Sequence, residues 1–342
     1  MASSSGSLPR YILVRLLLVI PMMWVLLTIV FFLLRVAPGD PVSAAVGGKL
    51  DAHALALRRA ALGLDRPLVV QYLEYLRNVA QFDFGHTISD NRPVLDIIKD
   101  QGGATLTLTL GAFLVALLVG LPLGRLAGRR RDTAADAGIR IFGVVSYAAP
   151  IFWVGIMLVV LVVKVFPGWP TYDIASVVTK FTVPPRTHIL LLDAILDGNG
   201  AALGDILKHH VLPCLTLGLL LSGVIIRLVR INVIQAMKGD YVEAARARGI
   251  AERHVVRRHA FRNALVPVIT VIGLQIALTL SGAILTERTF NWPGLGTELV
   301  QYITARDYIA VQGLVTFFAV VVVLVSVVVD IINALVDPRV RY

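Results

Sequence analysis

The residues whose types and spacing suggest a role are gathered in one charged segment, Lys238-Gly-Asp-Tyr-Val-Glu-Ala-Ala-Arg-Ala-Arg-Gly249. Asp240 and Glu243 have the spacing of a capping box, with Asp240 at the N-cap and Glu243 at the third helical position. Gly249 suits the left-handed residue that ends many helices. We therefore expect a helix of about two turns over 241–248. Small side chains on part of its surface come from Ala244, Ala245 and Ala247.

The chemistry that such a helix offers is non-covalent. With little side-chain bulk on one face it can enter a groove on a partner protein, whereas as a free surface helix it would bury little. The alternative is an ordinary amphipathic connector. The sequence has no G-x-x-x-x-G-K-[S/T] phosphate loop, so it offers no ATP site of that kind. The single cysteine, Cys214, lies in an apolar run and indicates an inert buried thiol. We expect no catalytic residue, metal site or bound cofactor in this chain.

The elements that must position this segment are membrane spans. Hydrophobic residues make up 57% of the 342 positions and charged residues only 16%, against about a quarter in soluble domains. A helical span needs roughly 20 mainly apolar residues. Six stretches qualify and predict an all-α integral membrane protein: 11–34, 104–124, 141–163, 209–226, 263–286 and 308–329. The first is too long for the apolar region of a signal peptide and has no nearby cleavage site, which predicts an uncleaved helix.

The distribution of basic residues predicts the orientation. With the N-terminus inside, the inner segments hold 18 basic and 7 acidic residues, and the outer segments hold 14 and 15. Lys and Arg are enriched on the cytoplasmic side of membrane proteins. Both termini are therefore expected in the cytoplasm. The net charge of +10 is then a topology signal that suits an anionic inner leaflet, and we expect no nucleic-acid partner.

Two outer segments are long. In residues 36–103, apolar residues recur at helical spacing, which favours a small helical cap with helices near 51–62 and 67–81 over an unstructured loop. Residues 165–208 contain several prolines and predict an irregular loop.

No ionisable residue lies deep within a predicted span, although ion-coupled transporters and channels commonly place one there. Energy for any transport is therefore expected from a separate subunit. Four polar residues stand inside otherwise apolar spans and either line a pathway or bond between helices: Ser146, Tyr147, Gln275 and Thr279.

At this point a family resemblance is visible. Glu243-Ala-Ala-x3-Gly249-x9-His259 looks like the EAA loop of ABC importer permeases. Several other segments resemble the dipeptide/oligopeptide branch of these permeases: 35–42, 258–270, 290–296, 306–308 and 311–313. Segments 82–85 and 212–213 match it more weakly. These matches occur in order along nearly the whole chain. One departure is Arg262, which stands where the general loop has Leu-Pro; the proline here is Pro267.

The resemblance implies a B-type permease with the type I ABC importer fold, multi-pass in a bacterial inner membrane. Its domains would be 1–35, 36–103 and a core over 104–342 that carries the EAA loop at about 232–262. Its partners would be a homologous C-type permease, two ABC ATPases that bind ATP and Mg, and an extracytoplasmic peptide-binding protein. The resemblance assigns ATPase coupling to Asp240, Tyr241, Glu243, Ala244, Ala245, Arg248 and Gly249.

The cargo expected from the resemblance is a di- or oligopeptide. Relatives of this branch differ in cargo, so nickel, glutathione, a sugar-like compound or another small solute is the main alternative. An ATP-independent channel or secondary transporter and a membrane scaffold or receptor subunit are two further classes.

Overall fold

The computed structural model describes residues 7–36, 42–43, 51–251 and 283–336. Between the last two ranges it also describes eight separate residues, at 254, 255, 261, 264, 268, 271, 275 and 279. Within these residues the chain is helical, and its only β pairing is an isolated bridge between His86 and Pro93. The expected all-α class is confirmed for this part of the chain.

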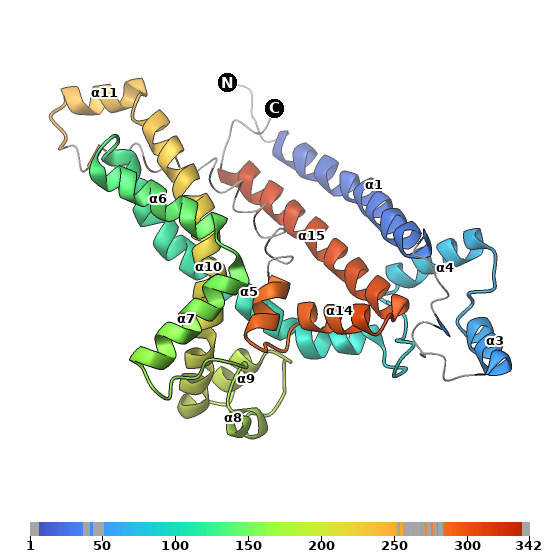
Figure 1. Cartoon of the computed structure of the whole chain (residues 1–342). Coiled ribbons are helices and arrows are strands. Elements are labelled where there is room, and N and C mark those ends of the chain that lie inside the picture. Colours follow the sequence, from blue (N-terminus) through green and yellow to red (C-terminus); the bar gives the residue numbers. More distant parts are fainter. Residues whose placement is uncertain are drawn as a thin grey trace.

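Four described helices are long and apolar enough to cross a membrane: α1 (Ser7–Val36), α5 (Val94–Arg129), α10 (Gly200–Ala236) and α15 (Tyr308–Val336) (Figure 1). They contain the predicted spans 11–34, 104–124, 209–226 and 308–329. The fourth predicted span, the shortest of the six, is part of a helix of 37 residues. At 1.5 Å per residue, α10 is about 55 Å long.

The predicted third span, 141–163, is not one continuous helix. The chain forms α6 (Ala134–Ala148) and α7 (Ile151–Val165), which are bent by 108° relative to each other. The break lies at Ala149-Pro150, where Ala149 is extended (φ −69°, ψ 137°). A proline disfavours helical backbone in the residue before it, and Pro150 then starts α7.

The predicted fifth span, 263–286, falls mostly outside the described residues. Its separate described members are helical, and residues 283–289 form a helix. With α6 and α7 counted as one bent span, the described part has up to five crossings, so six crossings and their orientation stay a prediction.

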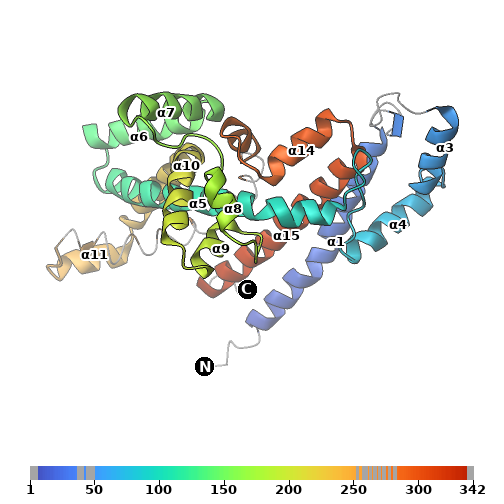
Figure 2. The same cartoon turned by 90° about the horizontal axis from the view of Figure 1, so that it is seen from below.

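The first long outer segment agrees with its sequence pattern. The predicted helices near 51–62 and 67–81 are α3 (Ala52–Ala61) and α4 (Leu68–Ala80). The hydroxyls of Tyr72 and Thr28 lie 2.6 Å apart, and those of Tyr75 and Thr316 lie 2.7 Å apart, so α4 is bonded to both α1 and α15. Figure 2 shows α3 and α4 at the edge of the molecule opposite α11 (Asp240–Ala247).

The second long outer segment, predicted as an irregular loop, is partly helical. It contains α8 (Val177–Thr182), α9 (Leu190–Leu196) and the first turns of α10. Asp205 in α10 holds the start of α8, because its carboxylate accepts hydrogen bonds from Ser176 N (2.8 Å) and Thr179 Oγ1 (2.7 Å). Prolines around these helices obscured short elements that tertiary contacts stabilise.

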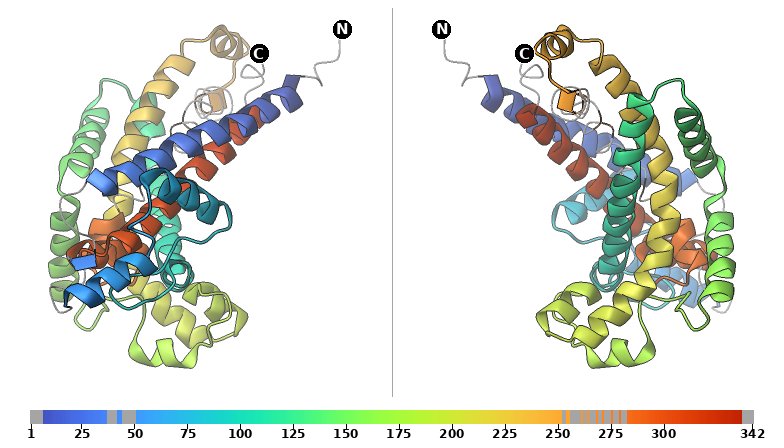
Figure 3. Two further views of the ribbon diagram at one scale, coloured as in Figure 1. Left: turned by 90° about the vertical axis from the view of Figure 1, so that its right-hand side faces the viewer. Right: turned by 90° about the vertical axis from the view of Figure 1, so that its left-hand side faces the viewer.

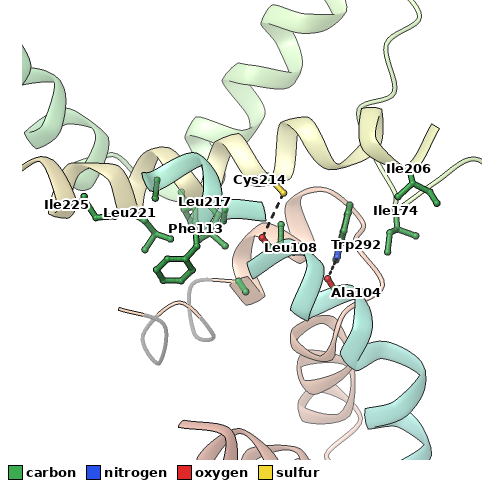
Figure 4. Packing of buried hydrophobic residues seen from close by; sticks show 14 of the residues in the cluster. Ala104, Leu108, Phe113, Ile174, Ile206, Cys214, Leu217, Leu221, Ile225 and Trp292 are labelled. Atoms are coloured by element: carbon green, nitrogen blue, oxygen red, sulfur yellow. Dashed lines mark hydrogen bonds between the residues drawn. The ribbon is translucent and has the colours of Figure 1, made fainter. Parts of the chain in front are cut away.

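The centre of the fold is the close pairing of α5 with α10 (Figure 3). Gly120, Gly124 and Gly128 recur every four residues on one side of α5, which is the spacing of small residues that lets membrane helices approach closely. They accommodate Ile225, Val229 and Val233 of α10, respectively. The core continues to Trp292, whose indole nitrogen donates to Ala104 O (2.9 Å) (Figure 4).

A second cluster joins α1, α4, α5, α15 and α14 (Leu295–Thr304). In it, α1 and α15 lie side by side (Figures 1 and 3), and Arg15 forms an ion pair with Asp330 at 3.3 Å. The ends of α1 and α15 nearest the chain termini point towards the end of the molecule that carries α11, whereas α8 and α9 lie at the opposite end (Figure 1).

Candidate functional site

The short helix α11 is seated on the end of α10. Helix α10 ends at Ala236, and α11 begins four residues later. The Tyr241 hydroxyl donates to Ala236 O at 2.9 Å. Beneath α11, Val242 and Ala245 pack with Val255 in a small apolar cluster. One side-chain hydrogen bond and one cluster therefore fix the position of α11 relative to α10.

The predicted capping box is wrong. The N-cap is Gly239 (φ −77°, ψ 145°), and Asp240 is the first residue of the helix, so Asp240 does not cap it. Val242 N donates to Gly239 O (2.8 Å), which starts the helix one residue earlier than expected. Asp240 and Glu243 still lie in the first turn, where their negative charges favour the positive end of the helix dipole.

The predicted C-terminal stop is confirmed. Gly249 has φ +73°, the left-handed conformation that glycine adopts without a steric cost. Its N–H donates to Arg246 O (2.9 Å), and Ile250 N donates to Ala245 O (3.2 Å). This pair of bonds is a Schellman motif. Ile250 also packs against the cluster beneath α11, so the helix is closed at the point where the sequence predicts it.

The two faces of α11 differ. Ala245 is 5% exposed and faces the cluster, so it is not part of the outward surface that the sequence suggests for it. Ala244 is exposed and Tyr241 is 40% exposed. Within 240–248, the exposed residues are Asp240, Tyr241, Glu243, Ala244, Arg246, Ala247 and Arg248. Ala244 and Ala247 give this surface small side chains, and charged side chains surround them.

An ion pair that sequence reasoning missed joins the end of α10 that carries α11 to the start of α6. Arg230, in the last two turns of α10, donates from Nε to Asp136 Oδ1 (2.6 Å) and from Nη2 to Asp136 Oδ2 (2.8 Å). Asp136 has no exposed surface and lies in the first turn of α6. A bidentate pair of this kind fixes direction as well as distance. The sequence did hold a signal for this pair. Asp136 precedes the predicted span 141–163 and Arg230 follows the predicted span 209–226, so the two opposite charges were expected on the same side of the membrane.

Beside this ion pair lies a cavity of about 1080 Å³. Its walls are the apolar side chains of α6 and α10, together with Val271 and Gln275. Guanidinium groups at one end come from Arg140, Arg227 and Arg230. Asp136 is paired with Arg230 and offsets one of these three positive charges. The charge of these four residues together is therefore positive.

The structure brings together two of the four predicted pathway residues. Tyr147 and Gln275 both line the cavity. Ser146 is half-buried on α6 and is not part of its lining. Thr279 is buried and donates to Gln275 O at 2.5 Å, so its hydroxyl bonds within its own helical segment. A pathway role stays a prediction for all four residues, and of the four only Tyr147 and Gln275 line this cavity.

Comparison with known proteins identifies the family. Residues 120–342 match the family described as "Binding-protein-dependent transport system inner membrane component". Residues 8–109 match "Binding-prot-dependent transport system membrane comp, N-term". The two matches together cover nearly the whole chain.

Three bacterial relatives align along almost their full length. The di/tripeptide transport system permease protein DppB of Pseudomonas aeruginosa (strain UCBPP-PA14) is 38% identical over 331 residues, 96% of this chain and 97% of the relative. The dipeptide transport system permease protein DppB of Escherichia coli (strain K12) is 37% identical over 337 residues, 97% and 99% of the two chains. The glutathione transport system permease protein GsiC of Salmonella choleraesuis (strain SC-B67) is 35% identical over 333 residues, 97% and 99%. The chain therefore belongs to the family of binding-protein-dependent transport system inner membrane components, the permeases that the sequence resembles.

Proposed function

We propose that this chain is the B-type permease of an ATP-driven importer that takes up di- or oligopeptides. The observation that carries the proposal is α11, an outward-facing helix with a small-residue centre that is fixed to α10. A helix placed in this way fits a cleft on a separate ATPase and transmits movement to the spans. The sequence contains no G-x-x-x-x-G-K-[S/T] motif, which agrees with an energy source in partner subunits.

The proposed complex contains a C-type permease, two ABC ATPases with ATP and Mg, and an extracytoplasmic binding protein. Helix α11 and the ends of α1 and α15 nearest the termini lie at one end of the molecule, which supports an inner face at that end and both termini in the cytoplasm (Figure 1). The arginines beside the cavity lie at this end too, in agreement with the enrichment of basic residues on cytoplasmic surfaces.

The peptide cargo rests on the relatives, two of which are named for dipeptide or di/tripeptide transport. Glutathione is the second candidate, because a relative at 35% identity is named for its transport. Both cargos are small and peptide-like, and the proposal leaves the choice between them to the binding protein.

Reconstitution in vesicles tests the proposal. We expect uptake of a labelled dipeptide only when both permeases, the ATPases, ATP and the loaded binding protein are present. Flux through the purified chain alone would indicate a channel, and assembly without flux would indicate a scaffold; each would overturn the proposal. Competition by unlabelled dipeptide and by glutathione identifies the cargo.

The two alanines of α11 provide a matched pair of variants. Ala244→Glu adds charge and bulk to the exposed face, so we expect an intact permease whose ATP hydrolysis no longer drives uptake. Ala245→Glu places the same group in the apolar cluster, and α11 itself should lose its packing. Hydrogen exchange of residues 240–249 separates the two effects: exchange should rise for Ala245→Glu only. Normal uptake by an assembled Ala244→Glu complex would contradict a docking role.

A further inference from the structure

A buried carboxylate lies at the end of the helical residues 283–289. Glu287 has no exposed surface. Its Oε1 accepts a hydrogen bond from Thr105 Oγ1 in α5 (2.7 Å), and its Oε2 accepts from Thr297 N in α14 (2.9 Å). One side chain therefore connects its own helical segment with α14, which begins eight residues later, and with α5, whose Thr105 is 182 positions away. None of the lysines and arginines that the structure describes forms an ion pair with it.

Helix α14 depends on this carboxylate for its start. Its N-cap residue is Gly294, which has no side chain to accept a hydrogen bond from the first turn. Thr105 Oγ1 accepts from Leu295 N (2.8 Å), and Glu287 accepts from Thr297 N. Helices usually receive this capping from a Ser, Thr, Asp or Asn at the N-cap itself. Here it comes from two other segments, and the positive end of the helix dipole favours the carboxylate.

The glycine at the N-cap leaves space for the carboxylate. A Cβ atom at residue 294 would overlap the carboxylate of Glu287, and the three atoms nearest to it all belong to that side chain. The backbone of Gly294 (φ −112°, ψ 171°) is one that any residue adopts. The glycine is thus required by the Glu287 carboxylate and not by the backbone conformation. This contact gives a reason for a glycine in the Trp292-Pro-Gly-Leu-Gly296 segment.

A second set of bonds holds the same loop without the carboxylate. Trp292 N donates to the backbone oxygen of Glu287 (2.7 Å), and the Trp292 indole donates to Ala104 O (2.9 Å; Figure 4). Trp292 is fully buried. Removal of the Glu287 carboxylate should therefore leave the loop folded and remove only the cap and its bond to α5.

We propose that Glu287 is a positioning residue that caps α14 from outside and ties the helical residues 283–289 to α5 and α14. This inference rests on the proposed function, in which movement enters at α11. The chain leads from α11 to residues 283–289, and from α14 directly into α15. The Glu287 connection joins these parts to each other and to α5, and it makes α14 and α15 move together with the helix that follows the coupling segment.

The test moves the capping group of α14 from Glu287 to residue 294 and leaves the connection to α5 broken. Glu287→Ala removes both cap and connection and should lower the melting temperature in detergent by about 2 °C or more. Adding Gly294→Ser to Glu287→Ala supplies a local N-cap, so most of that loss should be recovered. Gly294→Ser alone should destabilise the protein, because the serine meets the carboxylate. Equal effects of Gly294→Ser with and without Glu287 would overturn the assignment.

Transport separates positioning from stability. In vesicles with the complete complex, the double variant should fold and hydrolyse ATP but take up about five-fold less dipeptide per ATP, the lower end of ordinary coupling between sites. Wild-type uptake per ATP in the double variant would overturn the positioning role. If the unmodified complex itself shows no ATP-dependent uptake, the proposed function fails, and the melting temperatures still decide whether Glu287 caps α14.

Discussion

At one end of the molecule, α11 is fastened to α10 by residues close in sequence, such as Tyr241 and Ala236. Away from α11, the buried carboxylate of Asp307, directly before α15, accepts hydrogen bonds from Ile88 N (2.6 Å) and Ser89 N (2.9 Å), more than two hundred positions away. Local attachment leaves one face of α11 open to a partner, whereas long-range attachment removes polar groups from water and fixes several elements together. In the proposed importer, the α11 end is the part that receives movement, and the long-range bonds hold the arrangement of the elements away from it.

The largest expected effect concerns the Arg230–Asp136 ion pair, which is a long-range contact near the α11 end. Arg230→Ala leaves the fully buried Asp136 without its bidentate partner, which should destabilise the permease by about 3–5 kcal/mol. Thermal unfolding in detergent measures it. Arg140→Ala is the control, because Arg140 lies 3.8 Å from Asp136 and is half exposed, and it should cost at most about 1 kcal/mol. Equal losses would mean that the bidentate geometry does not matter.

The next effect concerns the pair of helices that connects the two ends. A Cβ at Gly124 would lie 2.7 Å from Val229 Cβ and 2.9 Å from Ile226 O, a backbone atom that cannot move alone. Gly124→Ala should therefore destabilise the permease by about 1–3 kcal/mol. Gly138 in α6 is exposed and has open space around it, so Gly138→Ala should stabilise by about 0.5–1 kcal/mol. Melting temperatures that move in the same direction would refute the close α5–α10 contact.

The smallest effect sharpens the description of α11 as a locally closed helix. Gly249→Val forces a β-branched residue into the left-handed region, at a cost of about 1–2 kcal/mol. Gly249→Asn should cost less, since asparagine tolerates this conformation. The expected order of hydrogen-exchange protection for residues 240–247 is wild type, then Asn, then Val. Identical protection in all three proteins would show that the Schellman stop does not hold the helix.

Sequence reasoning succeeded where the signal is local. The helical spacing around Tyr72 and Tyr75 predicted α4, and Gly249 predicted the end of α11, because both depend on neighbours within a turn or two. The capping box failed for a local reason: Gly239 could start the helix as well as Asp240 could. Pro150 stood within an apolar run and was a signal for the bend. Hydropathy alone does not detect it, because the residues on both sides of the proline are apolar.

The buried carboxylates could not be predicted in the same way. Asp136 and Glu287 lie just outside the predicted spans, so a search for charges at membrane depth passes over them. Their partners are 94 and 182 positions away, respectively. Without a structure, no spacing rule connects them. The cavity beside α6 is equally non-local, which is why only Tyr147 and Gln275 of the four polar candidates prove to line it.

The most direct measurement of the central claim uses the exposed centre of α11. The single native cysteine, Cys214, is buried, so a thiol at position 244 can be labelled selectively. We would measure how fast a membrane-impermeant maleimide labels Ala244→Cys in inside-out vesicles, with and without the ATPase subunits. Ready labelling that the ATPases suppress by about ten-fold or more, the protection that a buried interface centre gives, is the predicted result. Equal labelling with and without the ATPases would contradict α11 as the docking helix.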